Sequence, residues 1–165
     1  STFMNYDYSW IYFSTIIKLM KQEFPDQIPI FPLSGVIYFP KTNLPLNIFE
    51  KRYLQLVNDC MKTNKLMGMV QSKKNSDQVY KIGCLGKINL FEKTEDGRIL
   101  IKLTGITRFE IIKEVNNDKL YREFKVRYNK FYQDIENIKL QILEEKKLET
   151  LLEKIKIFFK KMDYF

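Results

Sequence analysis

Apolar and polar residues alternate across residues 66–132, which predicts a series of short β-strands. Residues 82–94 are expected to form a strand in which Gly83 and Gly86 allow a bulge or a close backbone approach, and residues 99–104 return with isoleucine or leucine at every odd position. Residues 124–129 alternate cleanly, so one face of this strand is expected to be buried. Gly97 indicates a hairpin turn because glycine readily adopts positive φ, and Gly105 is expected to break or bend the returning strand.

Residues 28–53 begin as an apolar strand, contain four prolines and then change to a helical period. Proline cannot donate to a sheet ladder and fixes φ near about −65°, so strands here are expected to be short or bent. Asn47 and Glu50 have the spacing of a capping box, which predicts that a helix begins there. The apolar face expected for this helix comprises Phe49, Tyr53, Leu56, Val57, Cys60 and Met61.

Residues 135–165 follow a helical period over at least four turns. Such a helix needs a partner surface, since packing of an apolar stripe supplies most of its stability. Two interpretations are open: the helix closes the open end of a barrel, or it packs on a second copy of the chain. The stripe comprises Leu148, Leu151, Leu152, Ile155, Phe158, Phe159 and Met162.

Residues 1–24 do not belong to the strand pattern. Their apolar run, residues 8–17, is too short to span a bilayer, which takes about 20 residues. No basic residue precedes the run, so we expect neither a signal peptide nor a membrane anchor. The segment either packs on the domain or is an upstream extension.

The net charge of +8 comes mainly from scattered lysines and not from an arginine cluster, which favours a solvated surface over a nucleic-acid patch. Cys60 and Cys84 lie on apolar faces and are expected to be buried thiols, typical of the cytoplasm. The chain has no histidine, no CxxC and no GxxxxGK[ST] loop. We therefore expect no cofactor, no metal and no enzyme activity.

Three groups of residues carry a family resemblance: residues 32–53, residues 68–88 and residues 96–109. In order and spacing they resemble the N-terminal domain of the ATP-dependent protease Lon (La), which is its substrate-binding module and also occurs as a free-standing protein. The resemblance implies a mainly β fold with α (α+β), namely a six-stranded PUA-like pseudo-barrel with one short helix packed on it, followed by a long C-terminal helix.

The same resemblance implies three segments. Residues 1–24 would be an N-terminal extension, and residues 25–133 would be the Lon N-terminal PUA-like β domain. Residues 134–165 would be the start of a C-terminal helical subdomain that is incomplete in this chain.

The function implied is non-catalytic binding of unfolded or tagged polypeptides, with a Lon-type ATPase and protease as partner. The alternatives are a PUA-like RNA-binding module and a scaffold that forms a homo-oligomer through the C-terminal helix. For single residues the structural interpretation stays open: Tyr38 and Phe39 as core, Glu50 as a cap, Arg52 in an ion pair, and Arg108 at a strand corner. The candidate substrate-binding residues are Val36, Ile37, Tyr38, Phe39, Glu50, Lys51 and Arg52.

Overall fold

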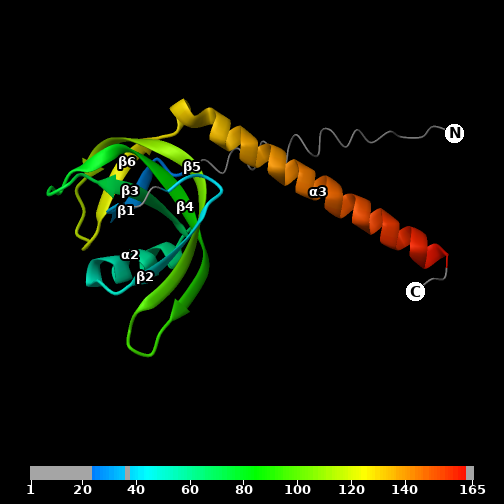
Figure 1. The fold of residues 1–165 in the computed structure, drawn as a ribbon, viewed down its shortest axis with the longest axis horizontal. Helices are drawn as coiled ribbons and strands as arrows, with labels where there is room; N and C mark the ends of the chain where they lie inside the picture. Colours follow the sequence, from blue (N-terminus) through cyan, green and yellow to red (C-terminus); the bar gives the residue numbers. More distant parts are fainter. Residues whose placement is uncertain (1–23, 36–37, 163–165) are drawn as a thin grey trace.

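The computed structural model describes residues 24–35 and 38–162 as a small β-barrel with one helix on its side and a long helix beyond it (Figure 1). This confirms the prediction of a mainly β fold with α. The elements are β1 (Gln27–Leu33), β2 (Asn43–Ile48), α2 (Lys51–Lys62), β3 (Leu66–Ser72), β4 (Val79–Lys93), β5 (Ile99–Val115), β6 (Arg122–Arg127), η1 (Asn129–Phe131) and α3 (Tyr132–Lys161).

The six strands form one sheet in the order β2-β5-β4-β3-β1-β6, and a further pairing of β5 with β6 closes it. The long strand β5 makes this possible because it has three partners. Its first part pairs with β2, its last part pairs with β6, and β4 runs antiparallel along most of its length. The six-stranded barrel implied by the resemblance is therefore present.

Strand β1 lies between β6 and β3, and its two ends are paired differently. Its first part is antiparallel to β6 and ends with Ile30 opposite Arg122, whereas its last part is parallel to β3. Continued, the register would place Tyr121 opposite Phe31 and Leu120 opposite Pro32, but the pairing ends at Arg122. The N–H of Leu120 instead donates to Oε1 of Gln55 on α2, at 2.8 Å. The chain before β6 is therefore bound to the helix, and the end of β1 borders an open space.

Helix α2 packs its apolar face on the sheet through Tyr53, Leu56, Val57 and Cys60, as predicted. The predicted start of the helix was wrong, because Glu50 is the N-cap residue and makes no side-chain capping hydrogen bond.

The residues before α2 belong to a strand or to the surface. Asn47 lies in β2 opposite Leu100, so the sheet ladder holds it in extended conformation and outcompetes the cap. Phe49, predicted on the buried face of the helix, precedes it and is 67% exposed.

The apolar side chains form two clusters. One lies between α2 and the sheet, and the other fills the barrel around the fully buried ring of Phe109. Cys60 and Cys84 are both buried, as predicted, and burial raises the pKa of each thiol to about 12. Both thiols are therefore protonated at neutral pH.

The loop of residues 38–42 docks on β5 at Gly105. The amide of Lys41 donates to the carbonyl of Gly105, and the amide of Gly105 donates to the carbonyl of Thr42, both at 2.9 Å. Strand β5 is not broken at Gly105, although its ladder with β4 shifts register there. The absence of a side chain is needed for the docking, because a Cβ at Gly105 would lie 2.3 Å from the carbonyl oxygen of Phe39.

Helix α3 extends away from the barrel (Figure 1). The Arg108 guanidinium binds both carboxylate oxygens of Asp134, at 2.9 and 3.0 Å, and lies 4.8 Å from the centre of the Phe131 ring. Arg108 therefore ties β5 to the first turn of α3, whereas it was predicted to hold a strand corner.

The side chains of the apolar stripe, from Leu148 to Met162, are 40–59% exposed. The interpretation that α3 closes the open end of the barrel is therefore wrong, and a homo-oligomer through this helix stays a prediction. Within the described ranges no helix has the length and hydropathy that a bilayer crossing requires.

Candidate functional site

A groove of about 1170 Å³ opens at one end of the barrel. It lies among the end of β1, the start of α2, the loop of residues 73–78 between β3 and β4, and the start of β6. The residues that line it are Ile30, Phe31, Pro32, Ser34, Gly35, Glu50, Arg52, Tyr53, Gln71, Ser72, Lys73, Lys74, Asn75, Ser76, Asp77, Val79, Tyr80, Leu120, Tyr121 and Arg122.

The groove has an aromatic floor. The rings of Phe31 on β1 and Tyr53 on α2 lie 4.3 Å apart between centroids, and Tyr121 is buried beside them. Burial raises the pKa of Tyr53, so its hydroxyl is neutral at physiological pH. At the rim, Tyr80 and Leu120 are 50% and 62% exposed. The groove therefore offers apolar surface to solvent at its rim and packed aromatic surface below.

Charged side chains surround this apolar surface. Arg52 binds Glu50 at 3.0 Å and lies 4.6 Å from the centre of the Tyr53 ring. Across the groove, Arg122 binds Glu114 at 2.8 Å and donates to the backbone carbonyl of Asp77 at 2.7 Å. The hydrogen bond from Arg122 lowers the pKa of Glu114. Each arginine is thus paired with a carboxylate, and Arg122 ties the loop of residues 73–78 to β6.

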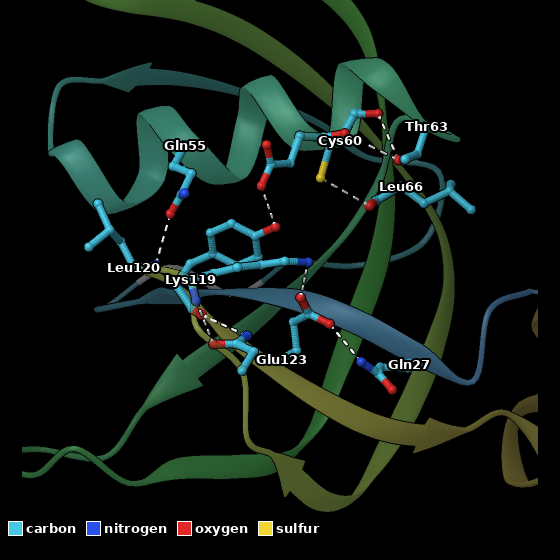
Figure 2. Close-up of polar contacts among 11 residues, drawn as sticks. Gln27, Gln55, Cys60, Thr63, Leu66, Lys119, Leu120 and Glu123 are labelled. Carbon is cyan, nitrogen blue, oxygen red and sulfur yellow. Dashed lines mark hydrogen bonds and ion pairs between the residues drawn. The ribbon is translucent and has the colours of Figure 1, made fainter.

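A polar network supports the wall of the groove where β6 begins (Figure 2). Figure 2 shows Gln55 of α2 bonded to Leu120 and Glu123 bonded to both Lys119 and Gln27. The Glu123 carboxylate accepts from Lys119 at 2.6 Å and from Gln27 of β1 at 2.7 Å. The backbone at Leu120 is therefore positioned by hydrogen bonds that involve α2, β1 and β6.

Replacing Glu123 with glutamine is expected to lower the free energy of unfolding by about 1–3 kcal/mol at pH 7, because a buried charged hydrogen-bond acceptor is lost. Burial raises the pKa of Glu123, but the hydrogen bonds from Lys119 and Gln27 outweigh it and the net pKa is lowered. A lowered pKa contributes stability above the unfolded-state pKa of about 4.3, and that contribution is lost as pH falls through the folded-state pKa.

The difference between Glu123→Gln and the parent chain should therefore shrink from pH 7 to pH 3 in urea unfolding curves. Glu153→Gln is the matched control, because that carboxylate is 69% exposed in a pair with Lys156. A constant difference across the pH range would contradict the assignment.

The structure places only part of the predicted site in the groove. Glu50 and Arg52 line it and bind each other, whereas Lys51 is exposed on the first turn of α2 and does not line it. Tyr38 is half-buried against the core and Phe39 is 54% exposed, and neither lines the groove.

Two predicted residues, Val36 and Ile37, lie outside the described residues.

Burial raises the pKa of the Tyr38 phenol, whose oxygen makes no hydrogen bond within the part of the chain that the structure describes.

Sequence reasoning missed the opposite wall of the groove. Lys73, Lys74 and Asp77 belong to a segment whose local pattern indicates only a polar loop, and Leu120 and Arg122 adjoin a turn. The sequence pattern near these segments does not show that they lie beside α2, because the barrel must close before they come together. Among the described residues no group of three or more His, Cys, Asp or Glu side chains could hold a metal.

Comparison with known proteins finds similarity to Lon proteases of several bacteria. A Lon protease of Dictyoglomus thermophilum is 24% identical over 151 residues, which is 86% of this chain and 17% of that protein. A Lon protease of Flavobacterium johnsoniae is 28% identical over 107 residues, 61% of this chain and 13% of that protein. The chain thus spans less than a fifth of the length of these relatives.

Among solved structures, a Lon N-terminal domain protein from Xanthomonas campestris aligns with a TM-score of 0.54 at 27% identity. The alignment covers 62% of this chain and 59% of that chain. The family model of the ATP-dependent protease La (LON) substrate-binding domain matches residues 27–162, which include every strand, α2 and α3. The chain therefore belongs to the Lon substrate-binding domain family.

Proposed function

We propose that residues 25–133 bind short unfolded or tagged segments of protein substrates in the groove and make or break no covalent bond there. The observation that carries the proposal is the combination of an aromatic floor with the exposed rim residues Tyr80 and Leu120. An unfolded protein displays apolar side chains that a native protein buries, and a groove of this composition offers them contact.

The open shape of the groove favours a polypeptide over a metabolite. Small-molecule pockets enclose about 300–1,000 Å³, and this groove is open and measures about 1170 Å³. Its rim also mixes fixed charges with apolar side chains, as at Arg52 beside Tyr53. Such a surface suits several consecutive residues of an extended chain, whose side chains alternate between apolar and polar contacts.

We further propose that a Lon-type ATPase and protease acts on what this domain binds. The support is family membership together with the share of the relatives that the chain spans, 13% and 17%. A recognition domain would raise the local concentration of a substrate at the catalytic machinery, whether that machinery belongs to the same polypeptide or to a separate one.

The test compares the binding of one client protein in its native form and in a permanently unfolded form. The unfolded form should bind and the native form should not, as measured by fluorescence anisotropy. Replacing both Tyr80 and Leu120 with alanine should weaken binding about tenfold or more, because exposed anchors of this kind contribute over about 1 kcal/mol each.

Leu90→Ala is the matched control, since Leu90 is 49% exposed but does not line the groove. Equal binding of both forms, or equal effects of the groove and control variants, would refute the proposal.

A further inference from the structure

The positive charges on the two walls of the groove differ in whether they are neutralised. Arg52 on the α2 wall is paired with Glu50, and Arg122 at the start of β6 is paired with Glu114. Lys73 and Lys74, on the loop between β3 and β4, form no ion pair with any described carboxylate. The groove therefore contains two ammonium groups whose charge is available to a ligand.

The loop that carries these lysines is fixed in shape. The amide of Lys73 donates to the carbonyl of Gln78 at 2.8 Å, and the amide of Gln78 donates to Oγ of Ser76 at 2.9 Å. The bond from Arg122 to the carbonyl of Asp77 fastens the loop to β6. A charge on an ordered loop loses less conformational entropy on binding than a charge on a free side chain and backbone.

The available charge lies beside the apolar surface. The Lys73 ammonium is 5.6 Å from the centre of the Tyr80 ring, at the rim of the groove. The lining carries four cationic side chains and two carboxylates, and one of those carboxylates, Glu50, is already bound to Arg52. The other, Asp77, lies near Arg122, whose pKa is raised first by the hydrogen bond to Glu114 and to a smaller extent by the Asp77 charge. The potential at the loop wall is therefore positive, next to exposed aromatic surface.

We propose that the groove prefers extended acidic segments, in which an Asp or Glu lies within a few residues of an aromatic or large aliphatic side chain. The apolar side chain packs on the Phe31, Tyr53 and Tyr80 surface while the carboxylate binds Lys73 and Lys74. Complementary charge selects among segments that the apolar surface alone would accept equally. This inference rests on the proposed function and names the class of segment that the same groove selects.

The experiment uses the full chain and three labelled peptides that share one aromatic residue and differ only in flanking Glu, Gln or Lys. The Glu peptide should bind about three- to tenfold more tightly than the Gln peptide at low salt, and the Lys peptide more weakly than both. The preference should fall sharply at about 0.5 M salt, because screening reduces exposed charge interactions.

Charge variants assign the preference to the loop. Lys73→Gln with Lys74→Gln should reduce the Glu-to-Gln affinity ratio to about one, because binding of the Glu peptide should weaken more than binding of the Gln peptide. Lys73→Glu with Lys74→Glu should reverse the preference toward the Lys peptide. The matched control is Lys160→Gln with Lys161→Gln, which removes the same net charge from exposed positions near the end of α3.

The outcomes separate this inference from the function on which it rests. If all three peptides bind equally and the Tyr80 and Leu120 variant weakens all of them, the groove binds polypeptides but the acidic preference is refuted. If the Glu-to-Gln affinity ratio fell equally in the Lys160 and Lys161 control variant, the acidic preference would also be refuted, since net charge alone would be responsible. If no peptide binds, both the inference and the proposed function are refuted.

Discussion

Replacing Phe109 with alanine is expected to lower the free energy of unfolding by about 3–5 kcal/mol, the usual cost of truncating a buried phenylalanine. The ring is fully buried in the barrel cluster. Gly68 and Gly83 leave the space that it fills, because a Cβ on either would lie 3.0 or 2.5 Å from the tip of the ring. Domains of this size are stable by about 5–15 kcal/mol, so the change is a large part of the total.

Urea unfolding followed by circular dichroism measures the effect of Phe109→Ala. Phe49→Ala is the matched control, because the same side chain is 67% exposed there and its removal should change stability by no more than about 0.5 kcal/mol. Similar losses for both variants would show that Phe109 does not anchor the barrel as described.

Replacing Gly105 with alanine is expected to cost about 1–3 kcal/mol and to detach the loop of residues 38–42, because the new Cβ would overlap backbone. The carbonyl oxygen of Phe39 would lie 2.3 Å from that Cβ, and the Cα of Pro40 would lie 3.1 Å from it. Backbone cannot rotate away as a side chain can, so the loop must move. Trypsin should then cleave after Lys41 faster than in the parent chain.

Gly86→Ala provides a close control for Gly105→Ala, because Gly86 pairs directly with Gly105 in the ladder. Its Cβ would meet only side chains, and the nearest atom is the Tyr38 hydroxyl at 3.1 Å. We expect a smaller loss of stability and unchanged cleavage after Lys41. If cleavage after Lys41 were equally fast in both variants, the docking of the loop on Gly105 would not be responsible.

The sequence was sufficient to predict the features that depend on a local period. The alternation in residues 99–104 and 124–129 identified β5 and β6, and the buried face of α2 followed from helical spacing at Tyr53 and Cys60. The start of α2 could not be predicted in the same way. Asn47 has good capping chemistry, but its pairing with Leu100 in the ladder is a tertiary interaction that no local pattern records.

The candidate site was predicted in part for the same reason. Glu50 and Arg52 were found because they adjoin a recognisable helix start, and they do line the groove. The facing wall comes from a loop and a turn that are 40 or more positions apart in the chain, as the bond between Arg122 and Asp77 shows. A hydrogen bond of this kind depends on barrel closure, so single-sequence patterns cannot indicate it.

The contacts of Asp134 with Arg108 hold α3 to the barrel at one end only, so a small rotation there moves the far end of the helix a long way. A helix of 30 residues is about 45 Å long, so a rotation of about 10° at its base moves its far end by about 8 Å. The hydrogen bonds from Arg108 and the contact of its guanidinium with Phe131 are concentrated at that base. A small change in the position of Arg108 or Phe131 would therefore shift the last turns of α3, and any molecule bound to them, by close to a nanometre.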